Sequence, residues 1–429
     1  MAKYDDMDKA IQRRTIGSHR GTRTLFKALL IVYLITLFIA VIALKAETPE
    51  ATSSSSAMST APGDTAMAEK KSAKAENVGI KFVTPVNLGD EGTITFKPGA
   101  RLQVRYVHTK EDTGGNNDFF IRRLRMKGGG SAFGIANYYF EVKLDNTGRF
   151  DVAPVAQVEN CWLDFPVVPG FAVRGGLYDF VFSRSALTSD SKGLFQDRTL
   201  IYGALAALGF ADNAIGILIH GRPFGGHFGY SGGVFDNVKF NAIGTEGRRQ
   251  AEGVMQVLRA EGYLLDPAPA GGYADYRESY VGKGKRLDIA ANVANLSNVQ
   301  IGEEKFDIVA WGGDVFGCYK QFNFQAEYDK YKENFENNNG TPDIDGHGWY
   351  AQAGYLFLPC MEAAVRYQEL EPNKSQSRDM LKWTSVGLNL YLREHNLKFQ
   401  TDYTFKKEEG GKEFEIDDDI FQVQLQLDF

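Results

Sequence analysis

The nine C-terminal residues, 421-FQVQLQLDF-429, alternate strictly between apolar and polar side chains. A period of two is the period of a β-strand, because successive side chains point to opposite faces of a sheet. One face would be entirely apolar, and the other would carry three glutamines and an aspartate. A soluble sheet can show this pattern. A terminal strand that ends on an aromatic residue is more typical of a transmembrane barrel, with lipid outside and a polar lumen inside.

Composition argues against a helical membrane protein. The chain has 429 residues, of which 43% are hydrophobic and 13% aromatic, with 46 glycines. A bundle of membrane helices would need several apolar runs of roughly 18 residues or more. Only residues 28–44 approach that length, so the rest of the chain would have to cross a membrane as strands.

The N-terminal region is predicted to lie outside the barrel. Basic residues precede the apolar run 28–44, and small residues follow it, as in a secretory signal peptide spanning residues 1–46. An uncleaved inner-membrane anchor is the alternative. Residues 47–77 contain no leucine, isoleucine, valine or aromatic residue. Such a composition cannot bury enough apolar area to fold, which predicts a flexible polar spacer over 47–78 and a barrel over 79–429.

Period-two segments recur along this barrel region, and no window shows a clear helical period. We predict an all-β fold, a transmembrane antiparallel β-barrel of about sixteen strands. The expected strands are 92–108, 117–128, 136–146, 154–165, 170–178, 214–222, 226–236, 253–264, 279–294, 303–316, 319–332, 347–358, 360–370, 381–393, 396–407 and 419–429. Their polar faces are rich in charged residues, which a dry core would not tolerate unpaired but a wet lumen would.

The connections should alternate between short periplasmic turns and long outer loops. Short turns are expected at 166–169, 222–225, 317–318, 358–359 and 394–395, and a longer first turn is expected from Gly128 to about Ile135, with Gly128–Gly130 at its start. Long loops are expected at 179–213, 237–252, 333–346, 371–380 and 408–418. One connection, residues 266–278, contradicts the alternation because it is too long for a periplasmic turn.

A column of cations marks the predicted lumen wall. In FFIRRLRMKGGG, Phe119 to Gly130, period two places three cations on one face and leaves Arg122 out of step, at a bulge or at the rim. The preceding strand adds two arginines to the neighbouring polar face. The column therefore consists of Arg123, Arg125 and Lys127 beside Arg101 and Arg105.

Like charges placed side by side destabilise a sheet by roughly 0.2–1 kcal/mol per pair, so this column needs a reason. An anion pathway supplies one, because the guanidinium fork matches phosphate and carboxylate oxygens two at a time. The alternative is a structural salt-bridge ladder with acids on the next strands. Glu141 and Asp145 have the right parity for that ladder, whereas parity admits only one of Glu159 and Asp164.

The longest connection, 179–213, is apolar enough to pack against protein rather than extend into solvent. A loop of this length and composition is expected to fold into the barrel and narrow the pore. It would bring the constriction-loop cations Arg184, Lys192 and Arg198 with it, opposed by Asp190 and Asp197. The alternative is a loop packed over the outer rim or against a neighbouring subunit.

Nothing in the sequence points to an enzyme. The six histidines and three cysteines show no metal-ligand spacing, and no nucleophile or phosphate-loop motif follows a strand. We therefore expect no catalytic residues, no metal, no cofactor and no nucleic-acid partner.

From about residue 90 to 429 the sequence resembles the phosphate-selective porin O and P family. The resemblance rests on FFIRRLRMKGGG, on GFAVRGGLYDFVFSRSALTS (Gly170–Ser189), on the FQDRTL and ALGF stretches, on AIGILIHGR (Ala214–Arg222) and on the terminal FQVQLQLDF. It implies a sixteen-stranded trimeric outer-membrane channel in a Gram-negative-type bacterium, with arginines that guide small anions, such as phosphate, past an inward-folded loop.

The resemblance also implies roles for individual residues. Arg122 and Arg123 match the paired arginines of the family, with Arg101 or Arg105 as neighbours, and Arg184 and Arg198 fall in the constricting loop. Two further arginines would join the anion path, Arg174 and Arg222. Phe429 would end the strand that the barrel-assembly machinery reads, and the outer-membrane lipid would surround the barrel.

The chain departs from the anion-selective pattern in its charge. The net charge is −6, and the expected outer loops 333–346 and 408–418 are acidic. A negative field repels anions that approach from outside. Three alternatives therefore stay open: a general porin without anion selectivity, a structural or partner-binding barrel of an envelope complex, and a soluble β-protein tethered through residues 28–44.

Overall fold

A computed structural model describes residues 84–87, 93–111, 114–150, 152–236, 250–251, 253–268, 281–301, 304–336, 342–376, 379–408 and 419–429. The predicted signal peptide lies outside these residues, and so does the predicted spacer. Both therefore remain predictions.

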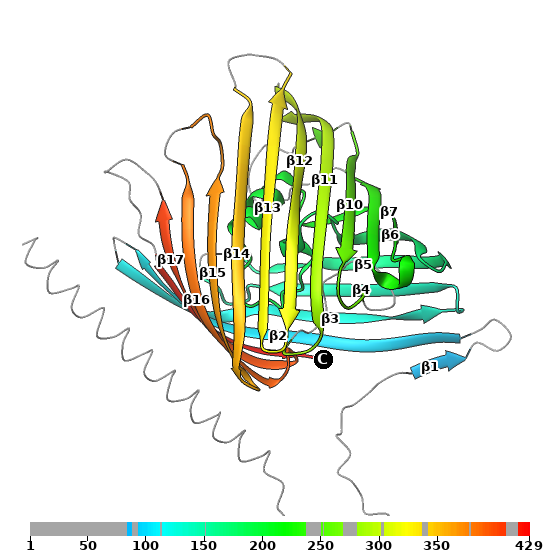
Figure 1. The fold of residues 1–429 in the computed structure, drawn as a ribbon, viewed down its shortest axis with the longest axis horizontal. Coiled ribbons are helices and arrows are strands. Elements are labelled where there is room, and N and C mark those ends of the chain that lie inside the picture. Colours follow the sequence, from blue (N-terminus) through cyan, green and yellow to red (C-terminus); the bar gives the residue numbers. More distant parts are fainter. Residues whose placement is uncertain are drawn as a thin grey trace, which may run out of the picture. The chain divides into compact units, whose positions relative to one another are not determined.

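Sixteen strands of the described chain form one closed antiparallel barrel (Figure 1). Each pairs with its neighbours in chain order, and the ring closes where β18 pairs with β2. The strands are β2 (Thr93–Glu111), β3 (Gly114–Ala132), β4 (Ala136–Asp145), β5 (Val155–Val168), β6 (Phe171–Asp179), β7 (Asn213–Gly221), β8 (Phe228–Phe235), β10 (Met255–Tyr263), β11 (Lys285–Ile301), β12 (Glu304–Tyr319), β13 (Phe322–Phe335), β14 (Ile344–Leu358), β15 (Met361–Glu371), β16 (Leu381–Arg393), β17 (Leu397–Glu408) and β18 (Asp419–Asp428).

Two short strands lie outside the ring. β1 (Thr84–Asn87) pairs with β2, and β9 (Gln250–Ala251) pairs with β11. β8 and β10 pair directly with each other, so β9 does not interrupt the barrel. The sixteen-strand barrel predicted from the sequence is confirmed.

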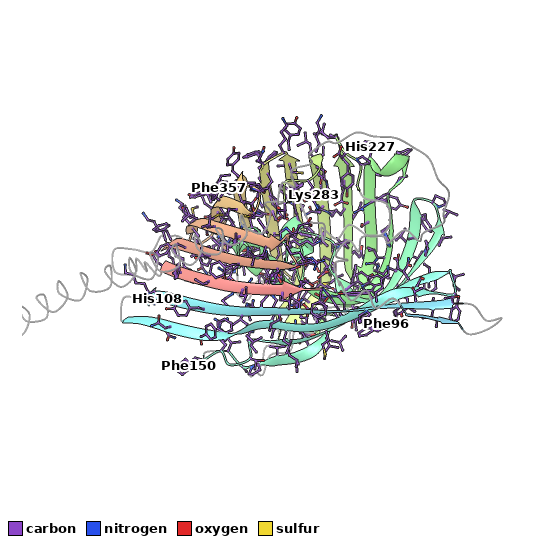
Figure 2. All side chains as sticks on the ribbon, turned by 90° about the horizontal axis from the view of Figure 1, so that it is seen from below. Phe96, His108, Phe150, His227, Lys283 and Phe357 are labelled. Carbon is purple, nitrogen blue, oxygen red and sulfur yellow. The ribbon has the colours of Figure 1, made fainter. Side chains whose placement is uncertain are left out.

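The terminal strand shows which face of the sheet meets lipid. In β18, Gln424 is 1% exposed and Leu425 is 49% exposed. Apolar side chains also point outward on the other strands, as Phe357 does in Figure 2, and lie exposed there. This arrangement is the reverse of a soluble sheet, and it is the one expected of a barrel that spans a bilayer.

Several boundaries differ from the prediction. β11 and β12 run further than expected, so residues 295–301 are strand rather than loop. The turn predicted at 317–318 lies at 320–321, where Lys320 adopts a positive φ of 53°. The connection between β10 and β11 is long, because β10 ends at Tyr263 and β11 begins at Lys285, although both of these strand ends lie at the end of the barrel with the short turns.

The first turn, predicted from Gly128 to about Ile135, is shorter than expected, and the assignment of Gly128–Gly130 to it is wrong, because these glycines lie inside β3. Their role is close packing. The stacked rings of Phe96 and Phe140 lie over Gly128, where a Cβ atom would come within 2.4 Å of Phe96. A Cβ atom on Gly130 would lie 1.7 Å from the carbonyl oxygen of Thr95. The actual turn is at 133–135, where Phe133 has a φ of 57°.

Residues 180–212, here called the β6–β7 segment, contain the helices α2 (Arg184–Leu187) and α3 (Leu200–Leu208). The side chains of Ser183 and Thr199 cap the N-termini of these helices. Within the described residues, no helix has the length and apolar character needed to cross a membrane, a finding that concerns helices alone.

The β6–β7 segment forms one apolar cluster with the barrel wall. Its buried residues include Phe180, Phe182, Ile201, Leu205 and Phe210. They pack with buried apolar side chains from the neighbouring strands, namely Met255, Val257, Ala294, Leu296, Val299, Phe306, Ile308, Ala310, Tyr331, Tyr350 and Leu370. On this side the barrel wall is therefore lined by a hydrophobic core rather than by water.

Candidate functional site: a cavity lined by arginines

The predicted arginine column exists on the β2–β3 wall. Arg123 and Arg125 are both buried on the polar face of β3. Arg101 of β2 lies directly opposite Arg125 in the sheet register, and Gln103 lies opposite Arg123. These residues lie on the inner face of the sheet, as parity predicts, and their role in an anion path stays a prediction.

Arg122 occupies a β-bulge, one of the two positions predicted for it. The register between β2 and β3 shifts so that Gln103 faces Arg123 while Val104 faces Ile121. The extra residue on β3 is therefore Arg122, and a bulge re-aims the side chain of its extra residue. Its Nη1 donates to Asn146 Oδ1 at 3.0 Å.

Carboxylates surround Arg125. Its guanidinium lies 2.9 Å from Glu141, 3.0 Å from Asp145, 3.1 Å from Glu159 and 3.6 Å from Asp190. The guanidinium is thus neutralised several times over. Such an arrangement is a structural ladder rather than a vacant anion site.

The expectation that only one of Glu159 and Asp164 could face the lumen is wrong. Both are buried on the inner face, Glu159 beside Lys143 and Asp164 beside Arg174 and His220. A second bulge explains this result, because Glu141 pairs with Asn160 and Val142 with Val158. Glu159 is the extra residue, and the parity of β5 changes there.

The remaining cations of the column are also bound. Arg101 donates to Asp428 at 2.9 Å, and Lys127 contacts the same carboxylate. Arg105 donates to Asp197 Oδ1 at 2.6 Å and to the backbone oxygen of Gln196 at 2.8 Å. The last strand and the β6–β7 segment therefore both contribute partners to this wall.

Asp190 and Asp197 carry the acidic side of the β6–β7 segment. Asp190 lies 3.1 Å from Arg123 and 2.9 Å from Arg198. Burial alone would raise the pKa of Asp190, but Arg123, Arg198 and Arg125 hold that pKa well below its usual range. The pKa of Asp197 is likewise lowered, because the field of Arg105 outweighs the effect of burial. Both groups are carboxylates at neutral pH.

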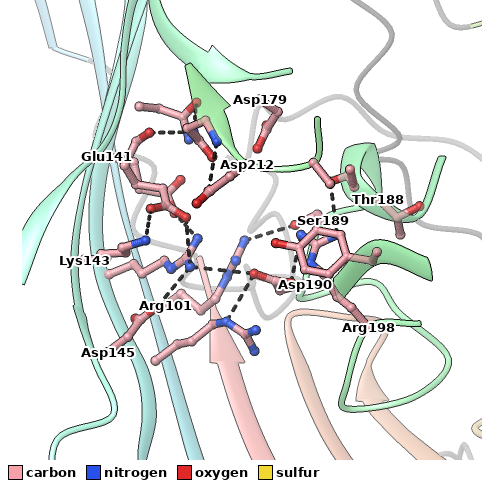
Figure 3. A pocket seen from close by; sticks show the side chains of 18 of the residues that line it. Arg101, Glu141, Lys143, Asp145, Asp179, Thr188, Ser189, Asp190, Arg198 and Asp212 are labelled. Atoms are coloured by element: carbon pink, nitrogen blue, oxygen red, sulfur yellow. Dashed lines mark hydrogen bonds and ion pairs between the residues drawn. The ribbon is translucent and has the colours of Figure 1, made fainter. Parts of the chain in front are cut away.

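A cavity of about 290 Å³, the arginine cavity, lies between the β2–β5 wall and the β6–β7 segment (Figure 3). Its charged lining consists of Arg101, Arg122, Arg123, Arg125, Lys143 and Arg198 together with Glu141, Asp145, Glu159, Asp179, Asp190, Asp197 and Asp212. Six cations thus meet seven anions. Within the described part of the chain, Arg122 is the cation of this lining that makes no ion pair with a carboxylate.

The other predicted site residues lie outside the arginine cavity. Arg174 pairs with Asp164 at 3.2 Å, and its guanidinium carbon lies 3.8 Å from the centre of the Trp162 ring. Arg222 follows β7, with its guanidinium carbon 5.6 Å from the centre of the Tyr263 ring. The structure does not bring either residue to the column.

Of the three constriction-loop cations, only Arg198 lines the arginine cavity. Arg184 pairs with Asp314 at 2.6 Å, and both Arg184 and Lys192 line a second cavity of about 340 Å³. This turn-side cavity is bordered by Asp266, Lys283, Cys318 and His395, which lie at the end of the barrel with the short turns.

Arg366 was not selected from the sequence, although it lines the narrow space between these cavities. It lies on β15 and donates to the backbone oxygen of Asp197 at 3.0 Å. Parity could have found Arg366, because it alternates with Val365 and Tyr367 on a predicted strand. Arg366 stands alone in its strand rather than in a run of arginines, so its sequence context does not mark it as part of a site.

Among the residues that the structure describes, no group of three or more histidine, cysteine, aspartate or glutamate side chains could hold a metal ion. The arrangement is instead a set of cavities with charged linings, bounded by the barrel sheet and the packed β6–β7 segment.

The barrel and its charged lumen define a channel of the outer-membrane porin class. The model of the family "Phosphate-selective porin O and P" matches residues 96–429, and the chain belongs to this family. Among curated proteins, an uncharacterized protein of Aquifex aeolicus (strain VF5) is 28% identical over 297 residues, which are 64% of this chain and 68% of that protein.

Solved structures share the fold. The anion-selective porin from Comamonas acidovorans has a TM-score of 0.57 at 13% identity, covering 78% of this chain and 100% of that one. The trimer form of OmpT, an outer membrane protein of Vibrio cholerae, has a TM-score of 0.51 at 10% identity, covering 78% and 99%. Family and fold together make this protein an outer-membrane β-barrel porin, a channel rather than an enzyme.

Proposed function

We propose that this porin passes small anions, phosphate and other oxyanions among them, by passive diffusion through an arginine-lined lumen. The observation that carries the proposal is Arg122. It lines the arginine cavity without a carboxylate partner, while the other cations of that lining are paired with acids. A guanidinium with spare donors can replace part of the hydration of a passing anion.

The β6–β7 segment is proposed to be the inward-folded loop that sets the size limit of the pore. Three contacts support this role. Asp197 binds Arg105 on β2, Gln196 donates to Asp402 on β17 at 2.9 Å, and Leu200 N donates to Gln368 on β15 at 2.9 Å. The segment is thus held to three strands of the wall, β15, β17 and β2, which lie within one stretch of five consecutive strands.

A general porin without anion selectivity is the second candidate. The charge balance of the arginine cavity favours it, because the seven anions of the lining offset the six cations. In this case the column would stabilise the wall, and the pore would discriminate by size.

Reversal potential separates the two candidates. The purified protein is placed in a planar bilayer across a KCl gradient, with and without added phosphate. We expect anion selectivity, block by phosphate, and loss of both in Arg122→Gln. Lys320→Gln, in a short turn, is the charge-matched control. Cation selectivity, or no effect of Arg122→Gln, would leave the general porin.

Assembly is proposed by analogy. The trimeric form of the Vibrio cholerae protein supports a homotrimer, and the family supports the outer membrane of a Gram-negative-type bacterium as the location. Cross-linking of the membrane-extracted protein tests the trimer. N-terminal sequencing of the mature chain tests cleavage after residue 46.

A further inference from the structure

A third, smaller cavity lies between the other two. This middle cavity has about 40 Å³ and shares Asp190, Asp197 and Arg198 with the arginine cavity. It shares Leu194, Gln325 and Gln352 with the turn-side cavity. The middle cavity is thus the smallest of these three cavities, and it shares lining residues with both of the others.

Each carboxylate oxygen of the two acids of the middle cavity already contacts a donor of the protein. Asp190 binds Arg198 through Oδ1 and Arg123 through Oδ2. Asp197 binds Arg105 through Oδ1 and accepts from Gln422 through Oδ2 at 2.6 Å.

Arg198, one of the two cations of the middle cavity, is also engaged. It pairs with Asp190, donates to the backbone oxygens of Ser185 and Ala186, and stacks on Tyr202 with 4.5 Å between guanidinium carbon and ring centre. The other cation, Arg366, behaves differently. It is 5% exposed, and among the residues that the structure describes it pairs with no carboxylate and its Nε has no hydrogen-bond partner.

The bonds that Arg366 does make hold it in place without consuming its donors. The Nη1 atom donates to the Asp197 carbonyl, and the guanidinium carbon lies 4.5 Å from the centre of the Phe195 ring. A guanidinium offers five N–H donors, so most of them remain for another acceptor. Among the groups that line the middle cavity, Arg366 is therefore the cation available to an anion.

We infer that Arg366 is a specificity-determining residue of the pore, in the middle cavity and on β15 rather than on the β2–β3 wall that carries the arginine column. Small oxyanions and halides would pass from Arg122 in the arginine cavity to Arg366 in the middle cavity and then to the turn-side cavity. This inference rests on the proposed function, because it concerns the same anion path. It adds a cation on β15 to the anion path, beside the cations on β2 and β3.

Reversal potentials of three variants test the role of Arg366. Arg366→Gln should lower the permeability ratio of chloride to potassium by roughly three- to tenfold, the effect of removing one nearby unit charge in a wet lumen. Arg366→Lys should keep most of that ratio. Gln368→Met is the matched control, because Gln368 holds the same segment from the same face of β15 and lines none of the three cavities.

Thiol modification tests the path itself. Arg366→Cys is made in a background without the native cysteines (Cys161→Ser, Cys318→Ser and Cys360→Ser). A small anionic methanethiosulfonate should react with it and reduce the current, and a cationic reagent of similar size should react more slowly. Heat-modifiable mobility on a gel confirms that each variant is folded.

Reversal potential and thiol modification together distinguish failure of the proposed function from failure of the inference about Arg366. If the wild type conducts without anion selectivity while Arg366→Cys is still modified and blocked, the anion preference of the proposed function fails and the path stands. If the wild type is anion-selective but Arg366→Gln and Gln368→Met shift the ratio equally, Arg366 is only an anchor of the segment. If neither reagent modifies Arg366→Cys, the path through the middle cavity is overturned.

Discussion

The backbone N–H of Arg184 donates a 2.8 Å hydrogen bond to Oε1 of Glu327, which ties the first turn of α2 to the inner face of β13. The N–H of Ser185 donates to the other carboxylate oxygen at 3.0 Å. Arg259 donates to the Phe182 carbonyl at 2.9 Å and to Asp314 at 2.6 Å. The root of the β6–β7 segment is therefore fixed by charge-assisted bonds at adjacent residues.

Glu327→Gln should loosen this root. An amide offers one oxygen to two N–H donors and sets its own N–H group against one of them, so a buried donor loses its partner at a cost of about 1–3 kcal/mol. We expect a noisier open-channel current and a lower temperature for the heat-modifiable shift. Glu369→Gln, whose carboxylate accepts from the outward-facing Tyr367 and from Trp349, is the control. Equal noise in both variants would show that Glu327 does not hold the segment.

Arg125→Gln should destabilise the barrel far more than Arg122→Gln. Removing Arg125 leaves Glu141, Asp145 and Glu159 close together without their shared cation, and breaking a buried ion pair costs about 3–5 kcal/mol. Arg122 has no such acids bound to it. Unfolding in urea, followed by the gel shift, measures the difference. Similar midpoints for the two variants would contradict the ladder described for Arg125.

The stability should fall in acid. The pKa of Asp190 is lowered in the folded protein by Arg123 and Arg198, so its contribution is present above the ordinary pKa of about 4 and is lost as the pH falls towards the lowered value. Melting of the wild type from pH 7 down to pH 2 should show a loss that begins near pH 4. Asp190→Asn should be less stable at pH 7 and show a smaller loss. Asp212→Asn, an exposed acid of the same cavity, should keep the full pH dependence.

Two glycines should respond to alanine in opposite ways. At Gly130 a Cβ atom would lie 1.7 Å from the carbonyl oxygen of Thr95, so Gly130→Ala must push two strands apart. At Gly203, inside α3, no atom lies within 4 Å, and alanine is favoured in a helix by about 1 kcal/mol. Thermal melting should place Gly130→Ala below the wild type and Gly203→Ala at or above it.

Phe429 should matter for assembly more than for stability. Its backbone closes a hydrogen-bonded pair with Ala100, at 2.9 and 3.0 Å, while its ring is 68% exposed. Phe429→Ala should therefore change the melting temperature little, since it keeps the backbone bonds, but lower the amount of barrel in the outer membrane. Phe357→Ala, another exposed phenylalanine, is the control. Equal amounts of both variants in the membrane would argue against Phe429 as an assembly signal.

Period two predicted the barrel because every spanning strand repeats the same physical constraint of lipid on one face and lumen on the other. Parity likewise predicted Arg101, Arg123 and Arg125 on the inner face. Parity failed where the backbone inserts a residue, as at Glu159, because a bulge depends on the pairing of two strands and leaves no periodic signal in one of them.

The sequence also could not predict which cations beside the β6–β7 segment lack an acidic partner. Which arginine remains without an acid is decided by contacts between segments far apart in the chain, such as Arg105 with Asp197 or Arg101 with Asp428. The sequence analysis therefore selected the arginine-rich stretch Phe119–Gly130, in which Arg123 and Arg125 are paired with acids. Arg366 is isolated in its strand, so no pattern in the sequence marked it as a site residue.

The apolar inner surface that β10–β15 share with the β6–β7 segment bears on how the protein matures. If the strands closed into a barrel before this segment docked, the apolar inner surface of β10–β15 would be exposed to water inside the barrel. We therefore expect the β6–β7 segment to dock while the barrel closes rather than afterwards. The segment would then act as an internal support during assembly of the barrel. Shortening it should therefore reduce the amount of assembled barrel rather than simply widen the pore.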